Sequence, residues 1–183
     1  MNARIDLAGY RVGTWDVDPV HSDVSFMTRH VGLTRFRRSF EKFSGEIVTT
    51  DDPLGSSVTA TVEITSFDTG LEKFNQHLLA EGFFDAENHP TAVFRSTALR
   101  PAGDRFALDG ELTLRGITRP VTFELELHGF GEGLGGQIKS AFSASTTIRR
   151  RDFGITFDAR LPGGTPIVGE EIQILLEIEA VLR

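Results

Sequence analysis

Apolar and polar residues alternate along several segments of this chain, and this pattern constrains the fold more than any other feature. In residues 121–127, the apolar Val121, Phe123 and Leu125 alternate with threonine and glutamate. The same period of two recurs in further segments, namely 58–64, 106–114, 138–148 and 172–182. Successive side chains of a β-strand point to opposite faces of its sheet, so each segment is predicted to be a strand with one buried face.

Less regular segments complete the predicted set of secondary structure elements. Residues near 14–30, 36–50 and 91–99 raise the prediction to about eight strands, which turn-forming residues separate. Residues 70–82 break the pattern, because Phe74 and Leu78 are spaced as on one side of a helix. The chain is therefore predicted to be all-β, with one short helix between the third and the fourth strand.

Strands with one apolar face and a single short helix leave two architectures, a sandwich of two sheets or a closed barrel. An eight-stranded barrel is just wide enough to be filled by side chains or to hold one small ligand. Small residues recur on the apolar faces, namely Ala60, Ala92, Ser96, Gly110, Ala144 and Ala180. Because empty space inside a protein costs stability, these residues favour an occupied lumen over one filled by side chains alone.

The amino-acid composition limits the cellular compartment and the class of partner that we expect for this protein. The chain has 183 residues and a formal net charge of −7, which argues against nucleic acid as a partner. It has no cysteine, which excludes disulfides and thiolate chemistry. Residues 1–12 lack the apolar run of a secretory signal, and no segment approaches the roughly 20 apolar residues of a membrane helix. We therefore expect a cytoplasmic protein that does not span a membrane, with an N-terminal extension over 1–13 and one domain over 14–183.

The chain lacks the patterns that mark common catalytic and metal sites. Residues 131–136 fit the string G-x-G-x-x-G, but a strand is predicted after them, so they are predicted to form a hairpin loop. The five histidines form no closely spaced ligand pair, and no serine stands in a G-x-S-x-G turn. We expect no metal, no catalytic residue and no required cofactor, and we predict a binding protein that is not an enzyme.

Several short motifs follow one another in order along residues 14–182. They are WDVDPVHS (15–22), His30, His77-Leu78, FFD (83–85), GELTLRGIT (110–118) and DFGI (152–155). In these motifs and in their order, the chain resembles the YceI-like family, which binds polyisoprenoids. The family often has Arg-Asp shortly before the His-Leu pair, whereas Phe74 and Asn75 stand here, so this chain lacks that charge pair.

The resemblance implies a lipocalin-like, eight-stranded antiparallel barrel with a long isoprenoid or another long-chain amphiphile in its lumen. A polyprenyl diphosphate or an isoprenoid quinone is a ligand of this type. The implied function is binding, storage or carriage of the lipid, with transient membrane contact for lipid exchange. The alternative is an enzyme that modifies such a lipid at the barrel rim, with His30 or His77 as acid or base. The sequence leaves open whether the protein is a monomer or a homodimer.

Strand parity then predicts two groups of ligand-binding residues. The lumen group comprises Phe26, Phe43, Val58, Val62, Phe94, Leu108, Leu112, Phe123, Leu125, Phe142 and Ile178. In an up-and-down barrel alternate strands end at one rim, so His30 and Arg150 are predicted to point inward there, near Asn75 and His77 of the helix. We predict that these four bind the polar head group, because arginine and histidine donate hydrogen bonds to a diphosphate or a carbonyl. Alternatively, the lumen residues pack only against each other and Arg150 pairs with a nearby carboxylate such as Asp152.

Overall fold

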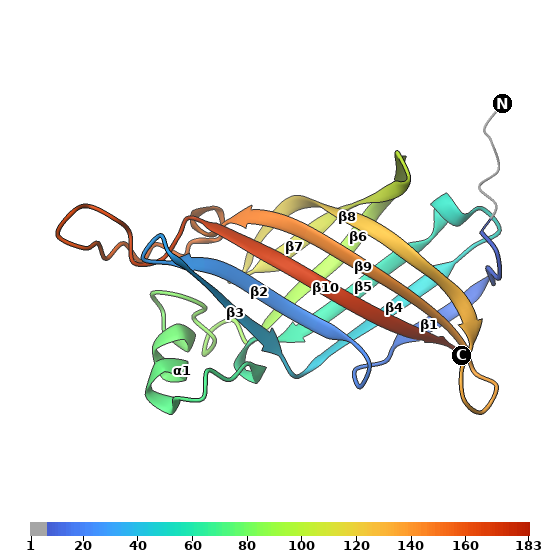
Figure 1. The fold of residues 1–183 in the computed structure, drawn as a ribbon, viewed down its shortest axis with the longest axis horizontal. Helices are drawn as coiled ribbons and strands as arrows, with labels where there is room; N and C mark the ends of the chain where they lie inside the picture. Colours follow the sequence, from blue (N-terminus) through green and yellow to red (C-terminus); the bar gives the residue numbers. More distant parts are fainter. Residues whose placement is uncertain (1–6) are drawn as a thin grey trace.

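The strands of the computed structural model form one antiparallel sheet that closes into a barrel (Figure 1). The structure describes residues 7–183, so the first six residues of the predicted extension over 1–13 lie outside the described residues. The strands are β1 (Gly13–Val17), β2 (Asp23–His30), β3 (Thr34–Phe40), β4 (Phe43–Thr49), β5 (Ser57–Glu63), β6 (Thr91–Ala102), β7 (Arg105–Leu114), β8 (Ile117–Glu132), β9 (Ile138–Arg149) and β10 (Glu171–Leu182). Strands β1 and β4 to β10 follow one another around the ring, and pairing of β1 with β10 closes it.

Two interruptions explain why ten strands stand where eight were predicted. Strands β1 and β2 lie end to end along β10, and residues 18–22 loop out between them. Strand β3 pairs with β2 and β4 pairs with β1, with a break at residues 41–42. Pro19 in the first loop has no backbone N–H to offer to a strand ladder. The predicted strands near 14–30 and 36–50 are thus each one interrupted strand, and the eight-stranded antiparallel barrel is confirmed.

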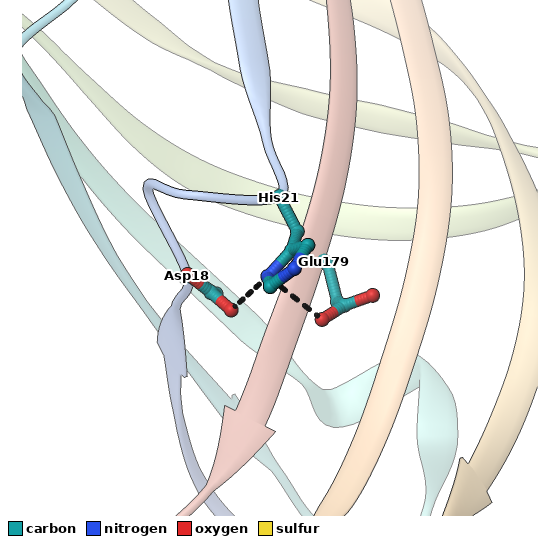
Figure 2. A group of neighbouring side chains, drawn as sticks. All are labelled: Asp18, His21 and Glu179. Carbon is teal, nitrogen blue, oxygen red and sulfur yellow. Dashed lines mark hydrogen bonds and ion pairs between the residues drawn. The ribbon is translucent and has the colours of Figure 1, made fainter. Parts of the chain in front are cut away.

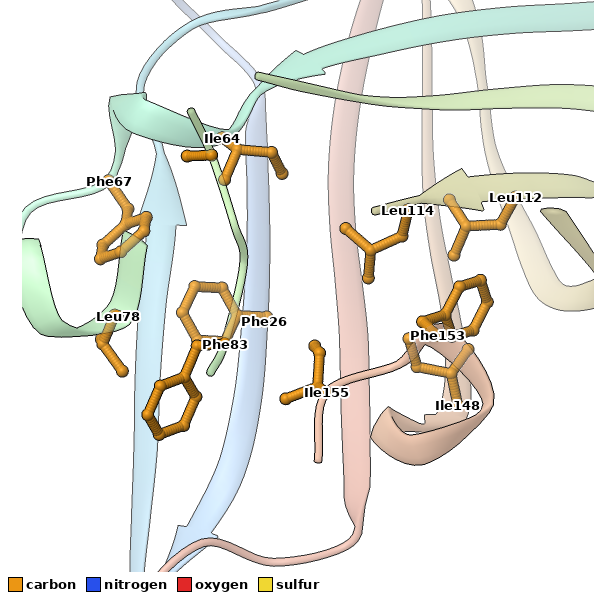
Figure 3. Close-up of a cluster of buried hydrophobic side chains, with 11 residues drawn as sticks. Phe26, Ile64, Phe67, Leu78, Phe83, Leu112, Leu114, Ile148, Phe153 and Ile155 are labelled. Carbon is orange, nitrogen blue, oxygen red and sulfur yellow. The ribbon is translucent and has the colours of Figure 1, made fainter. Parts of the chain in front are cut away.

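Helix α1 (Glu72–Leu79) connects β5 to β6, as predicted for residues 70–82. Three short 3-10 turns accompany it, namely η1 (Pro53–Gly55), η2 (Ile64–Ser66) and η3 (Arg150–Phe153). Figure 3 shows Leu78 of α1 and Phe83 beside Phe26 of β2, within a buried cluster that covers one end of the barrel. Within the described part of the chain, no helix is long and apolar enough to cross a membrane.

Three non-strand segments gather at this covered end of the barrel. They are α1, the turn at residues 31–33 and the long loop 154–170 that follows η3 (Figure 1). The loop runs beside β2, because Gly169 N–H donates to the Arg29 carbonyl at 2.9 Å and Val31 N–H donates to the Ile167 carbonyl at 2.9 Å. We call this end of the barrel the helix end.

Trp15 of β1 is buried toward the opposite end of the barrel, which we call the Trp15 end. The Trp15 side chain is only 1% exposed, and its indole N–H donates to Thr49 Oγ1 at 2.9 Å. Its ring centroid lies 5.6 Å from that of Phe130, which in turn packs edge-on against Tyr10 at 5.5 Å. A buried indole needs a hydrogen-bond acceptor, and Thr49 supplies it. These aromatic rings pack together at the Trp15 end of the barrel.

The turn between β7 and β8 anchors the segment after α1. Arg115 and Gly116 have φ angles of 53° and 70°, and positive values at both central residues suit a two-residue hairpin turn. A Cβ on Gly116 would lie 2.8 Å from the His89 ring, so the glycine is also needed for close packing. The Arg115 guanidinium donates to the carbonyls of Glu81 at 2.7 Å and Phe83 at 2.6 Å. These bonds hold the chain after α1 against the barrel.

Candidate functional site

An apolar cavity of about 290 Å³, the main cavity, extends from the helix end into the barrel. One water needs roughly 10–15 Å³ on the same measure, so this volume suits a long molecule better than isolated solvent. All the predicted lumen residues line it: Phe26, Phe43, Val58, Val62, Phe94, Leu108, Leu112, Phe123, Leu125, Phe142 and Ile178. The structure thus places these side chains on the inner face that strand alternation predicts, and their contact with a ligand stays a prediction.

Small residues create only part of this space. Ala60, Ala92 and Ala144 line the main cavity, as expected for residues that widen a lumen. The expectation was wrong for the other three small residues. A Cβ on Gly110 would lie 2.4 Å from the Phe94 ring, so the phenyl ring fills that space. The Ser96 hydroxyl accepts a hydrogen bond from the Val58 N–H at 2.8 Å, and Ala180 is fully buried by packing.

The polar groups of the cavity wall gather at the helix end. Apart from two serines, the polar residues that line the main cavity are Thr28, Arg29, His30, His77 and Arg150. His30 at the end of β2 and His77 of α1 are exposed to solvent although they line the cavity. The cavity therefore opens at the helix end, and a long molecule inside it would have an apolar environment along its length and polar neighbours at one end.

Arg150 is buried at this opening and binds the long loop that crosses it. Its side chain is 2% exposed, and its guanidinium donates to the carbonyl of Gly169 at 3.0 Å and to that of Ile155 at 2.8 Å. Burial lowers the pKa of Arg150, while the Glu170 carboxylate, 3.9 Å from its Nε, opposes this shift. The carboxylate paired with Arg150 is thus that of Glu170, and the suggested pairing with Asp152 was wrong.

Asn75 lies outside the lining of the main cavity, which departs from its predicted place beside the head group. Its amide nitrogen donates to Asp68 Oδ1 at 2.8 Å, and its carbonyl oxygen accepts from the Thr69 N–H at 2.9 Å and the Thr69 hydroxyl at 2.6 Å. The bond from Asn75 also lowers the pKa of Asp68. Asn75 therefore fixes the loop that leads into α1, because its polar atoms are already engaged there.

Phenylalanine rings surround the opening and form what we call the phenylalanine collar. Its members are Phe26, Phe36, Phe40, Phe67, Phe74, Phe83, Phe84 and Phe157, which contact one another or His77. His77 lies among three of them, with its ring centroid 5.1 Å from that of Phe83 and 5.9 Å from that of Phe157. The strand pattern predicted only Phe26 of this collar, because most of the others lie in α1, in loops or on the arginine-rich β3.

A second, smaller cavity of about 90 Å³ lies toward the Trp15 end. Trp15, Tyr10 and Phe130 are part of its wall. Five side chains line both cavities and form a partition between them: Ile47, Val58, Leu108, Leu125 and Phe142. The partition therefore sets how far into the barrel a molecule can reach from the helix end.

One cluster of metal-ligating residue types was not predicted from the sequence. Figure 2 shows Asp18, His21 and Glu179 together, with His21 Nδ1 2.7 Å from Asp18 Oδ2 and 3.7 Å from Glu179 Oε1. The Lys139 ammonium lies 2.5 Å from the same Glu179 oxygen. The hydrogen bond from His21 lowers the pKa of Asp18, and Glu179 raises that of Lys139. The lysine already supplies a cation here, so we assign these residues to holding the loop 18–22 against β10.

The comparison with known sequences identifies a family and its relatives. The sequence model of the YceI-like domain matches residues 15–180. A UPF0312 protein of Pseudomonas aeruginosa is 30% identical over 175 residues, which cover 95% of this chain and 87% of that protein. A UPF0312 protein of Photorhabdus laumondii is also 30% identical, over 95% of this chain and 86% of its own length. The match therefore extends over nearly the whole of both chains.

Solved structures share the barrel. BcnA of Burkholderia cenocepacia matches with a TM-score of 0.77 and 27% identity, over 89% of this chain and 98% of that one. A polyisoprenoid binding domain from Saccharophagus degradans, implicated in plant cell wall breakdown, matches with a TM-score of 0.71 over 94% of this chain and 100% of that one. Its sequence is 13% identical, so this second likeness concerns the fold alone.

Proposed function

Because the chain belongs to the YceI-like family, we propose that it binds one long-chain isoprenoid lipid in its barrel. The apolar tail occupies the main cavity, and the polar head group lies at the helix end. The observation that carries this proposal is the distribution of polar residues in the cavity wall. Apart from two serines the wall is apolar along its length, and its charged and histidine side chains lie at the open end. The protein from Saccharophagus degradans that shares this fold is a polyisoprenoid binding domain.

The apolar wall would give a long tail most of its affinity. Burial of each CH₂ equivalent gains about 0.8 kcal/mol before the costs of ordering the chain. A tail of many carbons therefore approaches the practical ceiling of non-covalent affinity, and such a lipid stays with the protein during purification. We propose that storage or carriage of the lipid, without a further cofactor, is the role of the barrel, and that it works in the cytoplasm.

The head-group part of the proposal rests on three of the four predicted residues. His30 and His77 are exposed at the opening, and their ring N–H groups can donate to a diphosphate or a quinone carbonyl. Arg150 uses two of its five N–H groups on loop carbonyls, and its remaining donors suit an anionic oxygen. Asn75 is no longer included, because Asp68 and Thr69 engage its amide.

Organic extraction of the purified protein followed by mass spectrometry tests the proposal. We expect one long-chain isoprenoid or a comparable amphiphile at close to one molecule per chain. Protein that yields no lipid, and that takes up no added polyprenyl diphosphate or isoprenoid quinone after delipidation, would show that the barrel is not a lipid-binding protein. Incubation of the protein with the extracted lipid tests the alternative of an enzyme at His30 or His77, and we expect the lipid to be recovered unchanged.

Single-residue variants test the place of the head group. One charge-assisted hydrogen bond contributes about 1.5–3 kcal/mol, so we expect His30→Ala or His77→Ala to weaken binding of a polyprenyl diphosphate about 10- to 150-fold. His128→Ala is the matched control, because His128 is an exposed histidine bonded to Ser143, away from the lining of the main cavity. Equal affinity in all three variants would contradict the assignment of the head group to the helix end.

A further inference from the structure

Exposed apolar side chains surround the opening of the barrel. Seven large apolar residues in the described part of the chain are exposed: Val12, Val20, Leu33, Leu71, Phe74, Leu134 and Leu161. Four of them lie at the helix end, where Leu33 is 76% exposed and Leu71 is 62% exposed. Scattered apolar residues are common on protein surfaces, but a group around one opening indicates contact with an apolar partner.

Two of these leucines stand at the tips of neighbouring loops. Leu33 lies in the turn 31–33 and Leu161 in the loop 154–170, and both loops project from the same end in Figure 1. A Cβ on Gly32 would lie 3.5 Å from the Thr165 side chain, so the two loops are in contact. The backbone bonds between these segments fix this arrangement. Leu33 and Leu161 are therefore presented together to whatever the helix end approaches.

The β2–β3 hairpin at the same end is basic. Although the chain has a formal net charge of −7, residues 24–40 contain four arginines and no carboxylate. Arg29 of β2 and Arg35 of β3 stand directly opposite each other and are exposed, and neither forms an ion pair among the residues that the structure describes. Like charges in this position repel and destabilise a hairpin. An anionic surface in contact with the hairpin would offset that repulsion.

The two carboxylates of the loop 154–170 are engaged by other arginines. Asp158 Oδ1 lies 3.2 Å from Arg151 Nη2 and 3.0 Å from Arg160 Nη2. Glu170 Oε2 lies 2.9 Å from Arg151 Nε. Both carboxylates of the loop are thus paired with arginines of the same region. Arg29, Arg35 and Arg38 keep their charge without an ion pair among the described residues, and Arg29 also donates to the Leu33 carbonyl at 3.2 Å.

We propose that the helix end docks on the surface of an anionic phospholipid bilayer, with Leu33, Leu71 and Leu161 inserted at the interface and Arg29 and Arg35 on the lipid phosphates. This inference rests on the proposed function and deepens it. The opening of the main cavity would face the bilayer, so that a lipid tail passes between bilayer and lumen without crossing water. Apolar insertion combined with attraction of basic residues to anionic lipid is the usual basis of such interfacial binding.

Sedimentation of the full-length protein with vesicles tests this docking. The vesicles are phosphatidylcholine alone or a two-to-one mixture of phosphatidylcholine and phosphatidylglycerol. We expect binding to the mixed vesicles only, and weaker binding as salt is raised, because salt screens the attraction. Each basic residue near an anionic surface contributes about fivefold, so Arg29→Gln/Arg35→Gln should weaken binding about 30-fold. Leu33→Ser/Leu161→Ser should also reduce the bound fraction.

Matched controls remove the same side chains elsewhere. Arg11→Gln/Arg95→Gln removes two exposed arginines without ion pairs among the described residues, and Leu134→Ser removes a leucine that is 98% exposed. Both should bind vesicles like the unchanged protein. Equal losses in the two arginine pairs, or no vesicle binding by the unchanged protein, would overturn the proposal. A dimer in size-exclusion chromatography that Leu33→Ser/Leu161→Ser makes monomeric would overturn it in favour of a second copy of the chain.

The two proposals fail in different ways. Protein that yields a bound lipid on extraction but does not bind vesicles overturns the docking and leaves the proposed function in place. Protein that binds vesicles through Arg29 and Arg35 but never contains lipid supports the docking surface and contradicts the lipid-filled barrel. Extraction and vesicle sedimentation on the same preparation therefore separate them.

Discussion

Ala144 offers a direct way to test whether the lumen is occupied by a lipid. It lies in the middle of β9 with only 6% of its surface exposed, and it lines the main cavity. Its cross-strand neighbours are Leu125 on β8 and Leu176 on β10, both of which also line the cavity. Ala144→Phe would project a phenyl ring from this wall into the lumen. We expect the variant to fold and to contain no lipid, because the ring takes the space of the tail.

The expected change in stability follows from ligand linkage. A ligand present at 100 to 1,000 times its Kd stabilises the folded state by about 2.7–4.1 kcal/mol. For a chain of this length each kcal/mol moves Tm by about 2–4 °C, so delipidation of the unchanged protein should lower Tm by about 5–16 °C. In Ala144→Phe the buried ring gains about 1.5–3 kcal/mol, and overpacking costs about 1–3 kcal/mol. These two terms roughly cancel, so the Tm of Ala144→Phe should lie near that of the delipidated unchanged protein. Because the variant contains no lipid, delipidation should leave its own Tm unchanged.

Calorimetric scans before and after delipidation, with mass spectrometry of the same samples, check this prediction. Ala98→Phe is the matched control, because Ala98 is exposed on β6 and does not line either cavity. This variant should contain as much lipid as the unchanged protein, and delipidation should lower its Tm by the same amount. Two results would refute the reasoning. One is full lipid content in Ala144→Phe, and the other is a Tm of the unchanged protein that stays constant when its lipid is removed.

Three further substitutions test the partition, a surface ion pair and the β7–β8 turn. Phe142→Ala should join the cavities of about 290 and 90 Å³ and shift the extracted lipids toward longer tails, and an unchanged distribution of chain lengths contradicts this. The Arg100 guanidinium lowers the pKa of Asp109 to about 2 from an ordinary 3.8, so the pair stabilises the fold above pH 4 and loses this effect as pH falls toward 2. Asp109→Asn should therefore lower the urea midpoint at pH 7 but not at pH 2, and equal losses at both would be inconsistent. Gly116→Ala should cost about 1–2 kcal/mol in urea unfolding, because φ is 70° and the Cβ would lie 2.8 Å from the His89 ring; an unchanged midpoint would argue against strain there.

Strand alternation predicted the inner face of the barrel because side-chain parity is a local property. Once residues 121–127 form a strand with one apolar face, Phe123 and Leu125 must point the same way, whatever strand lies beside them. The interruption at residues 18–22 was not predicted. The Asp18 N–H and the Ser22 hydroxyl both donate to the Glu179 carbonyl of β10, which is distant in sequence. The strand pattern carries no information on such a partner.

The helix end was harder to predict, because its residues follow no period. Phe157 reaches the opening from a loop, and Phe36 stands among arginines on β3, where Arg38 lies over its ring at 4.4 Å. Polar residues posed a different difficulty. Parity indicated that Arg150 points inward, but the carbonyls it serves belong to the loop 154–170, whose path no local pattern defines. Buried backbone carbonyls need donors, and only the folded chain shows which side chain supplies them.

The two ends of the barrel differ in how readily they could open for the proposed exchange of a lipid. The strands that surround the main cavity are joined by ladders of backbone hydrogen bonds, so opening them would break many bonds at once. The segments around the opening are a short helix, a turn and a loop, held by a few backbone bonds and by side chains such as Arg115 and Arg150. Local opening costs least where few backbone bonds must break, so passage of a lipid should use the helix end. This is also the end where exposed leucines and unpaired arginines meet, so the surface proposed to touch a bilayer and the part of the barrel that opens most readily coincide.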